Sequence, residues 1–171
     1  MRVKVMIPEE QVQQRIAELA DELNQRYLDT PLHLVGVLKG SIFFLCELAK
    51  RLAMPVTLDF MRVSSYGDGT ESTGQVKVLQ DLSEEVAGRH VLLVEDIVDT
   101  GVTLEWMQQF FEARQPAEFV TCALLDKPSR RTRPVKADYV GFVVEDQFVV
   151  GCGLDYAQQY RNLPYIGILE R

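Results

Sequence analysis

The sequence predicts an α/β fold in which a mostly parallel twisted sheet is flanked by helices, as one domain over residues 1–171. Apolar runs of strand length alternate with segments of helical period along the chain, which is the pattern of a parallel sheet covered on both faces. A length of 171 residues fits one domain, and 47% hydrophobic with 25% charged residues is ordinary for a globular protein. We therefore expect one hydrophobic core without repeats or linkers.

The first elements follow from periodicity and from breakers. Residues 8–27 place apolar side chains on one face at a spacing of 3.6, and Pro8 suits the first turn of such a helix. The apolar run 32–38 predicts a buried strand, and Ser41 is expected to cap a helix that ends near residue 52. Pro55 separates that helix from a further strand at 56–63.

A polar segment, residues 64–74, contains three glycines and almost no apolar side chain. A long polar loop between strands is usually disordered or functional, and we expect a function. Periodicity and breakers also predict the remaining strands and the remaining helix. They are strands at 75–79, 90–94, 119–125, 139–144 and 148–150, and a helix at 103–113.

Charge and composition exclude several classes of protein. The net charge of −7 disfavours nonspecific nucleic-acid binding, which needs a basic surface. The chain starts without the apolar stretch of a secretory signal and contains no run of 18 apolar residues, so we expect neither secretion nor a membrane span. Cys46, Cys122 and Cys152 are an odd number without paired spacing, which favours reduced thiols and a cytoplasmic location. Two histidines without a Cys-x-x-Cys pair offer no zinc site.

The segment 91–103 carries the chemistry. Four apolar residues form a strand, Glu95 and Asp96 stand where it is expected to end, and residues 99–103 (Asp-Thr-Gly-Val-Thr) form a tight loop that enters a helix. In open α/β sheets ligands bind outside the carboxyl ends of the strands. Gly101 lets the backbone approach a ligand, and the helix N-terminus offers free N–H groups to a phosphate. Carboxylates beside a phosphate site suit a phosphorylated sugar, whose hydroxyls donate to them.

Parts of this segment also occur in other kinds of site and in other classes of protein. Any one of these residues alone is compatible with a helix cap or a solvated loop residue, but the whole ordered string indicates a functional site. A receiver domain places its acidic strand near the N-terminus, whereas this strand lies in mid-chain. A P-loop ATPase requires Gly-x-x-x-x-Gly-Lys-[Ser/Thr], and a dinucleotide fold requires Gly-x-Gly-x-x-Gly; neither string is present.

The string resembles the phosphoribosyl pyrophosphate (PRPP) motif of type I phosphoribosyltransferases, and nearly the whole chain resembles the bacterial hypoxanthine (hypoxanthine-guanine) members of that family. Further matching stretches are Leu38-Lys-Gly-Ser41, Ser65-Tyr66, Ser72-Thr-Gly74, Lys127, Phe148-Val-Val-Gly151, Leu154-Asp-Tyr156 and Arg161. The PRPP motif is specific for the superfamily, and the later matches carry the purine assignment. Val102 fills a variable slot with a side chain that offers no polar group, and Asp126 stands where the family is often apolar, without an explanation from sequence.

The resemblance implies a role for each matching position. Asp99 is the expected general base for the purine N7 proton. The ribose-phosphate group is expected on Glu95, Asp96, Asp99, Thr100, Gly101, Val102 and Thr103. Pyrophosphate is expected on Lys39, Gly40, Ser65, Tyr66 and Arg161, the purine on Lys127, Phe148, Val149 and Asp155, and magnesium on Glu95, Asp96 and Asp155.

The resemblance also implies purine salvage: Mg²⁺-dependent transfer of phosphoribose from PRPP to hypoxanthine, and to guanine, with release of pyrophosphate. It implies a small hood over the base site, closure of residues 64–74 as a lid, and a homodimer or homotetramer. Two alternatives stay open, an RNA-binding regulator on this fold and a nucleotide-binding module without turnover. The sequence does not rank hypoxanthine, guanine and xanthine.

Overall fold

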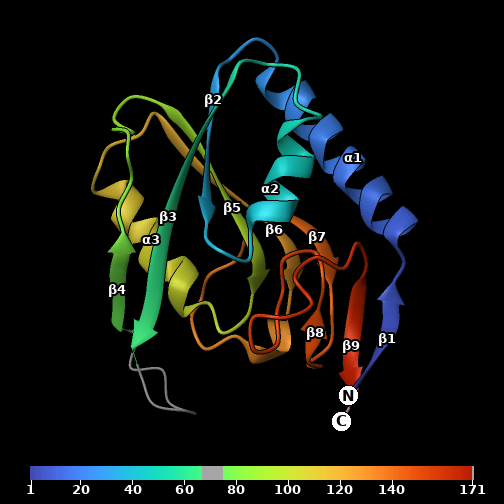
Figure 1. The fold of residues 1–171 in the computed structure, drawn as a ribbon. Coiled ribbons are helices and arrows are strands. Elements are labelled where there is room, and N and C mark those ends of the chain that lie inside the picture. The colour runs from blue at the N-terminus through green and yellow to red at the C-terminus, as the bar shows by residue number, and fades with distance from the viewer. Residues whose placement is uncertain (67–74, 171) are drawn as a thin grey trace.

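A six-stranded sheet and a smaller three-stranded sheet form the framework of the protein, in a computed structural model that describes residues 1–66 and 75–170 (Figure 1). The expectations for Ser72-Thr-Gly74, and for a lid made by residues 64–74, fall largely outside the described residues. The elements in chain order are β1 (Arg2–Ile7), α1 (Glu9–Tyr27), β2 (Leu32–Val37), α2 (Ile42–Ala49), β3 (Val56–Tyr66), β4 (Gln75–Gln80), β5 (His90–Val98), α3 (Val102–Glu112), β6 (Glu118–Asp126), a 3-10 turn (Pro128–Arg130), β7 (Tyr139–Val143), β8 (Val149–Val150) and β9 (Ile166–Glu170).

The large sheet has the order β4-β3-β2-β5-β6-β7. Its strands are parallel except β4, which runs antiparallel to β3. The carboxyl ends of β2, β3, β5 and β6 therefore lie at one edge, and the loops that follow them gather there. The predicted α/β fold is confirmed.

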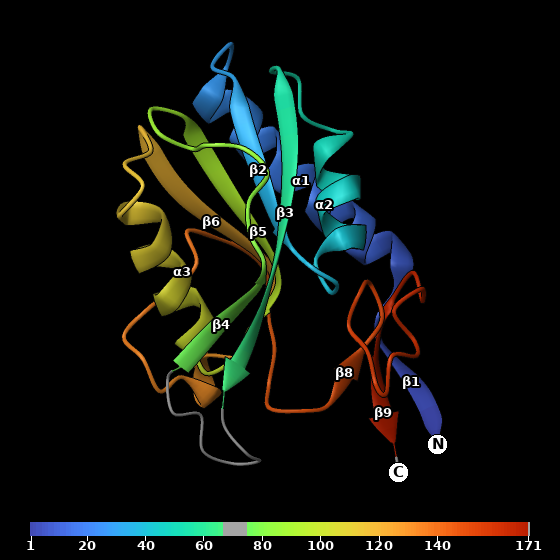
Figure 2. The ribbon, with the colours of Figure 1, turned by 60° about the vertical axis from the view of Figure 1, so that its left-hand side comes forward.

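Helices cover both faces of this sheet. α1 and α2 lie on one face and α3 on the other, as both ribbon views show (Figures 1 and 2). Side chains alternate between the faces along each strand. On β5, Leu92 and Val94 pack in one apolar cluster with α1 and α2, whereas Leu93 packs in another with Met107 and Phe111 of α3. Two buried faces explain why the central strands are apolar throughout.

The small sheet is antiparallel, with the order β1-β9-β8, and brings both ends of the chain together (Figure 2). It is the predicted hood. β1 and β9 were not predicted, because their pairing joins the two distant ends of the chain and leaves no local signal in the sequence.

Several predicted boundaries were wrong. β5 runs on to Val98 instead of ending at residue 94, because Glu95 and Ile97 keep their pairing with β6. α2 ends at Ala49, and the Ser41 hydroxyl donates to the carbonyl of Val37 at 2.7 Å instead of capping the helix.

No helix in the described part of the chain is long and apolar enough to cross a membrane.

Candidate active site

The phosphate loop, residues 99–101, joins β5 to α3 at the edge where the parallel strands end. Gly101 adopts φ 91°, a left-handed conformation that favours glycine, and α3 begins at the next residue. A Cβ at Gly101 would also lie 2.8 Å from Cδ of Arg131. A cavity of about 240 Å³ opens on this loop, lined by Glu95 to Gly101 together with Thr103 and Leu104. The residues predicted to hold ribose phosphate thus share one cavity, except Val102.

Glu95 and Asp96 are consecutive residues in the last part of β5, and both line this cavity. Burial raises the pKa of Glu95 well above its usual range, and the neighbouring charge of Asp96 adds to this. Desolvation likewise raises the pKa of Asp96 to about 6, although backbone N–H groups and Arg161 oppose the shift. Desolvation disfavours the charged form of a carboxyl group, and a hydroxyl donor or a cation placed against it restores that form. These two groups therefore fit a site for ribose hydroxyls.

The loop after β2 lies against Asp96. The peptide bond between Leu38 and Lys39 is cis. A Cβ at Gly40 would overlap Oδ2 of Asp96, and a Cβ at Gly153 would overlap the carbonyl oxygen of Gly40. Three segments that are far apart in the sequence therefore approach at distances that only glycine permits. This contact brings the predicted pyrophosphate loop to the predicted ribose carboxylates.

Gln158, which sequence reasoning missed, joins the two cations predicted to bind pyrophosphate. Its Oε1 accepts from Nζ of Lys39 at 3.2 Å and from Nη2 of Arg161 at 3.1 Å. Its N–H donates to Oδ2 of Asp155 at 2.8 Å, and Arg161 lies 3.5 Å from Oδ1 of the same carboxylate. The structure therefore brings Lys39, Asp155 and Arg161 into one polar cluster.

The residues predicted to bind the purine come from two places, since Lys127 follows β6 of the large sheet whereas Phe148 directly precedes and Val149 begins β8 in the small sheet. Lys127 is buried, with its Nζ 3.9 Å from Oδ1 of Asp146, so it is not a solvated loop lysine. The ring of Phe148 is 52% exposed and meets Tyr156 edge-on at a centroid distance of 5.7 Å. An exposed phenylalanine offers a free face for stacking, whereas a core phenylalanine would not. Val149 is buried and pairs with Ile168.

Ser65 and Tyr66 occupy the end of β3, at the same edge of the sheet. Ser65 is exposed, and the side chain of Tyr66 lies outside the described part of the structure. No contact among the described residues brings either one to the phosphate loop.

Charged residues around Lys127 were also missed by sequence reasoning. Arg130 donates from Nε to Oδ1 of Asp99 at 3.0 Å, and its Nη1 lies 3.5 Å from Asp146. Arg131 pairs with the buried Asp126, which accounts for the charge at that position. The signal that could have found them is the run of charges next to Lys127, within a turn opened by Pro128.

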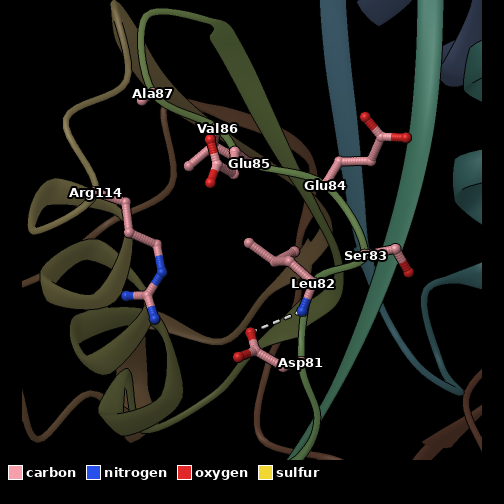
Figure 3. Close-up of a pocket in the computed structure, with 8 residues that line it drawn as sticks. All are labelled: Asp81, Leu82, Ser83, Glu84, Glu85, Val86, Ala87 and Arg114. Atoms are coloured by element: carbon pink, nitrogen blue, oxygen red, sulfur yellow. Dashed lines mark hydrogen bonds between the residues drawn. The ribbon is translucent and has the colours of Figure 1, made fainter.

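A larger cavity, of about 430 Å³, lies away from these residues (Figure 3). It is lined by residues 81–87 and by Arg114, and the side chains drawn there include three carboxylates and one guanidinium. None of the predicted site residues lines it. The larger cavity is therefore separate from the predicted site.

A parallel sheet with a phosphate loop after its central strand and two carboxylates beside that loop is the arrangement of a phosphoribosyltransferase. The family model described as phosphoribosyl transferase domain matches residues 8–157 of this chain.

The similar proteins narrow this class. The chain is 49% identical over 167 residues to the hypoxanthine-guanine phosphoribosyltransferase of Bacillus subtilis, covering 98% of this chain and 93% of that protein. It is 47% identical to the hypoxanthine phosphoribosyltransferase of Escherichia coli, covering 96% and 94%. A crystal structure of a hypoxanthine phosphoribosyltransferase from Staphylococcus aureus superposes with a TM-score of 0.95 at 45% identity, covering 98% and 91% of the two chains. The chain belongs to the hypoxanthine phosphoribosyltransferases.

Proposed function

We propose that this protein is a purine-salvage enzyme that transfers the 5-phosphoribosyl group of PRPP to hypoxanthine, and to guanine, giving IMP or GMP and pyrophosphate. The observation that carries the proposal is the contact of Gly40 with Asp96, which joins a strand-end loop bearing a lysine to the carboxylates beside the phosphate loop. One PRPP molecule, which carries a phosphate at C5 of its ribose and pyrophosphate at C1, matches these adjoining sites. The names of the similar proteins support the same reaction.

Each group of the two substrates has its own set of residues in the proposed complex. The 5-phosphate lies on the phosphate loop and the first turn of α3, at residues 99–103, and Glu95 and Asp96 accept hydrogen bonds from the ribose hydroxyls. Lys39, Gly40, Ser65, Tyr66 and Arg161 hold pyrophosphate. The purine stacks on Phe148 and is read by the backbone of Val149, while Lys127 donates to its 6-oxo oxygen.

In the reaction, the bond from C1 of the ribose to pyrophosphate breaks as a purine nitrogen bonds to C1. Positive charge develops on the sugar, and the leaving group gains negative charge that Lys39 and Arg161 neutralise. Asp99 accepts the proton that N7 of the purine releases. The 45% exposure of the Asp99 side chain leaves it accessible to a purine.

Magnesium fits the donor set, because Glu95, Asp96 and Asp155 supply only oxygen ligands. Among the described residues no group of three such side chains could by itself hold a metal ion. That agrees with an ion held by one or two carboxylates, with substrate oxygens and water as its other ligands. When bound, magnesium would stabilise the charge of the departing pyrophosphate.

Other expectations stay predictions. These are a homodimer or homotetramer, a single domain over residues 1–171, and a cytoplasmic location. The three free cysteines support a reducing compartment. Light scattering of the purified protein measures the assembly directly.

A spectrophotometric assay with PRPP, magnesium and hypoxanthine, guanine, xanthine or adenine in turn tests the function. We expect IMP and GMP with stoichiometric pyrophosphate, and loss of both when EDTA removes the metal. Binding without pyrophosphate release would support a module without turnover instead. Retention of RNA in a filter-binding experiment, without turnover, would support the regulator.

A further inference from the structure

Asp126 is a buried carboxylate at the carboxyl end of β6. Its backbone is fixed on both sides, because it pairs with Val98 of β5 and Val143 of β7. Its side chain is 11% exposed and forms an ion pair with Nη2 of Arg131, which is 15% exposed. Burying both charges costs desolvation that pairing only offsets, so stability alone is a weak reason for this pair.

The same Arg131 reaches the phosphate loop from behind. Its Nη1 donates to the carbonyl oxygen of Asp99 at 2.6 Å, and the N–H of Thr132 donates to the carbonyl oxygen of Thr100 at 2.8 Å. The stem of Arg131 fills the space beside Gly101 that a Cβ would need. Three successive residues of the loop are thus held from one side by residues 131–132.

Holding these carbonyl groups also orients the N–H groups of the loop. In a trans peptide, C=O and the following N–H point in opposite directions, and the peptides of this loop are trans. The N–H groups of Thr100 and Gly101 therefore point away from Arg131 and Thr132. Neither has a hydrogen-bond partner within residues 1–66 and 75–170. Free N–H groups at the start of a helix are phosphate donors.

We propose that Asp126 and Arg131 are positioning residues that hold the phosphate loop ready for the 5-phosphate of PRPP and of the product nucleotide. Asp126 fixes the guanidinium, and the guanidinium fixes the carbonyl of Asp99. The N–H donors are then already in place when a phosphate binds, so less of the binding free energy is lost in ordering the loop. The identity of this ligand rests on the proposed function.

The double variant Asp126→Leu/Arg131→Met tests the proposal, because it removes the pair without leaving one charge buried and unpaired. Calorimetric titration with IMP and, separately, with inosine isolates the contribution of the phosphate. We expect the Kd for IMP to rise about 10- to 100-fold, as when hydrogen bonds from a charged group are lost, and the Kd for inosine to stay the same. The KM for PRPP should rise while the KM for hypoxanthine does not.

Arg15→Met is the matched control, since Arg15 also donates to two backbone carbonyls, those of Val140 and Gly141, but between α1 and β7. It should bind IMP like the unaltered protein. Arg131→Lys is a second variant, which keeps the charge opposite Asp126 but lacks the planar fork that reaches both partners. We expect Arg131→Lys to lose IMP affinity several-fold. If the double variant does not fold, the IMP affinity of Arg131→Lys tests the proposal by itself.

Folded variants that bind IMP as tightly as the unaltered protein would overturn the positioning role and leave the proposed function intact. Equal losses for IMP and inosine would also overturn it, since the effect would then not concern the phosphate. Failure of the unaltered protein to bind IMP or PRPP would instead refute the proposed function.

Discussion

Asp99 accepts a hydrogen bond at 3.0 Å from Nε of Arg130, so the expected general base is ion-paired with a residue from the neighbouring loop. Both side chains are almost half exposed, at 45% and 46%. Arg130 also lies 3.5 Å from Asp146, which gives it a second carboxylate partner. Exposed pairs of this kind contribute little to stability. Arg130 can therefore exchange partners and free Asp99 for a substrate without disturbing the fold.

Asp99→Asn should fold normally but lose about 10²- to 10⁴-fold in kcat, the usual contribution of general acid–base catalysis. Asparagine keeps the shape of the side chain and removes its ability to take up a proton. The measurement is steady-state kinetics beside a thermal melt, with Asp29→Asn as an exposed control of equal charge change. Turnover near that of the unaltered enzyme would rule out this role for Asp99.

Glu95→Gln combined with Asp96→Asn should weaken PRPP binding more than purine binding. Both carboxylates line the cavity on the phosphate loop, where their oxygens can accept hydrogen bonds from ribose hydroxyls. Calorimetry with each substrate in turn measures the two losses. Equal weakening of PRPP and purine would contradict the ribose assignment.

Gly40→Ala should raise the KM for PRPP with little change in the melting temperature. The added Cβ would overlap Oδ2 of Asp96, so either the loop after β2 or the carboxylate must move. Kinetics at varied PRPP and a thermal melt report the two effects separately. An unchanged KM for PRPP would mean that the close approach of these segments does not serve binding.

Lys127→Ala should lower kcat/KM for hypoxanthine far more than for adenine. A lysine ammonium has three donors and no acceptor, so it satisfies a 6-oxo group but not the 6-amino group of adenine. Sites built around one hydrogen bond reject a mismatched analogue by about 10⁴- to 10⁵-fold, and adenine should be essentially no substrate of the unaltered enzyme. The two rate constants are measured for both proteins. An unchanged ratio would assign specificity to backbone groups near Val149.

Acid should destabilise the protein partly through His33. Burial lowers the pKa of His33, Arg89 lowers it further, and Asp59 and Glu84 only partly oppose this. The folded state therefore keeps a neutral imidazole, with Nδ1 2.7 Å from Oγ1 of Thr57, while the unfolded chain takes up a proton below pH 6.5. Since the unfolded state binds more protons there, stability falls as the pH drops through 6.5 toward the folded pKa.

The free energy of unfolding in urea at pH 7.5 and pH 5.5 measures this effect. His33 should account for a loss of at most about 1.4 kcal/mol at pH 5.5, one unit below the unfolded pKa. His33→Asn, whose amide can keep the bond to Thr57, should lose less stability over the same range. An identical pH dependence in both proteins would contradict a role for His33.

Much of the fold could be read from the sequence because its signals are local. The buried strands β2, β5 and β6 are short apolar runs, and α1 carries a periodic apolar face. The phosphate loop could be predicted because a strand end, a glycine and a helix start follow one another within a few residues. The strands β1 and β9 could not, because β1 pairs with β9 at the other end of the chain and β9 lies between β1 and β8, so neither strand has an adjacent partner in the sequence.

The candidate site divides in the same way. Sequence by itself predicted roles for Asp99, Lys127 and Phe148 as single positions, since each lies in a recognisable string. Only the tertiary structure decided that Gln158 binds Lys39 across 119 positions, that Arg130 holds Asp99 across 31, and that Asp126 anchors the arginine behind the phosphate loop. The physical reason is that a local motif is set by the conformations of adjacent residues. Contacts between side chains of different loops depend on where the strands and helices place the ends of those loops. These positions are determined only when the sheet assembles.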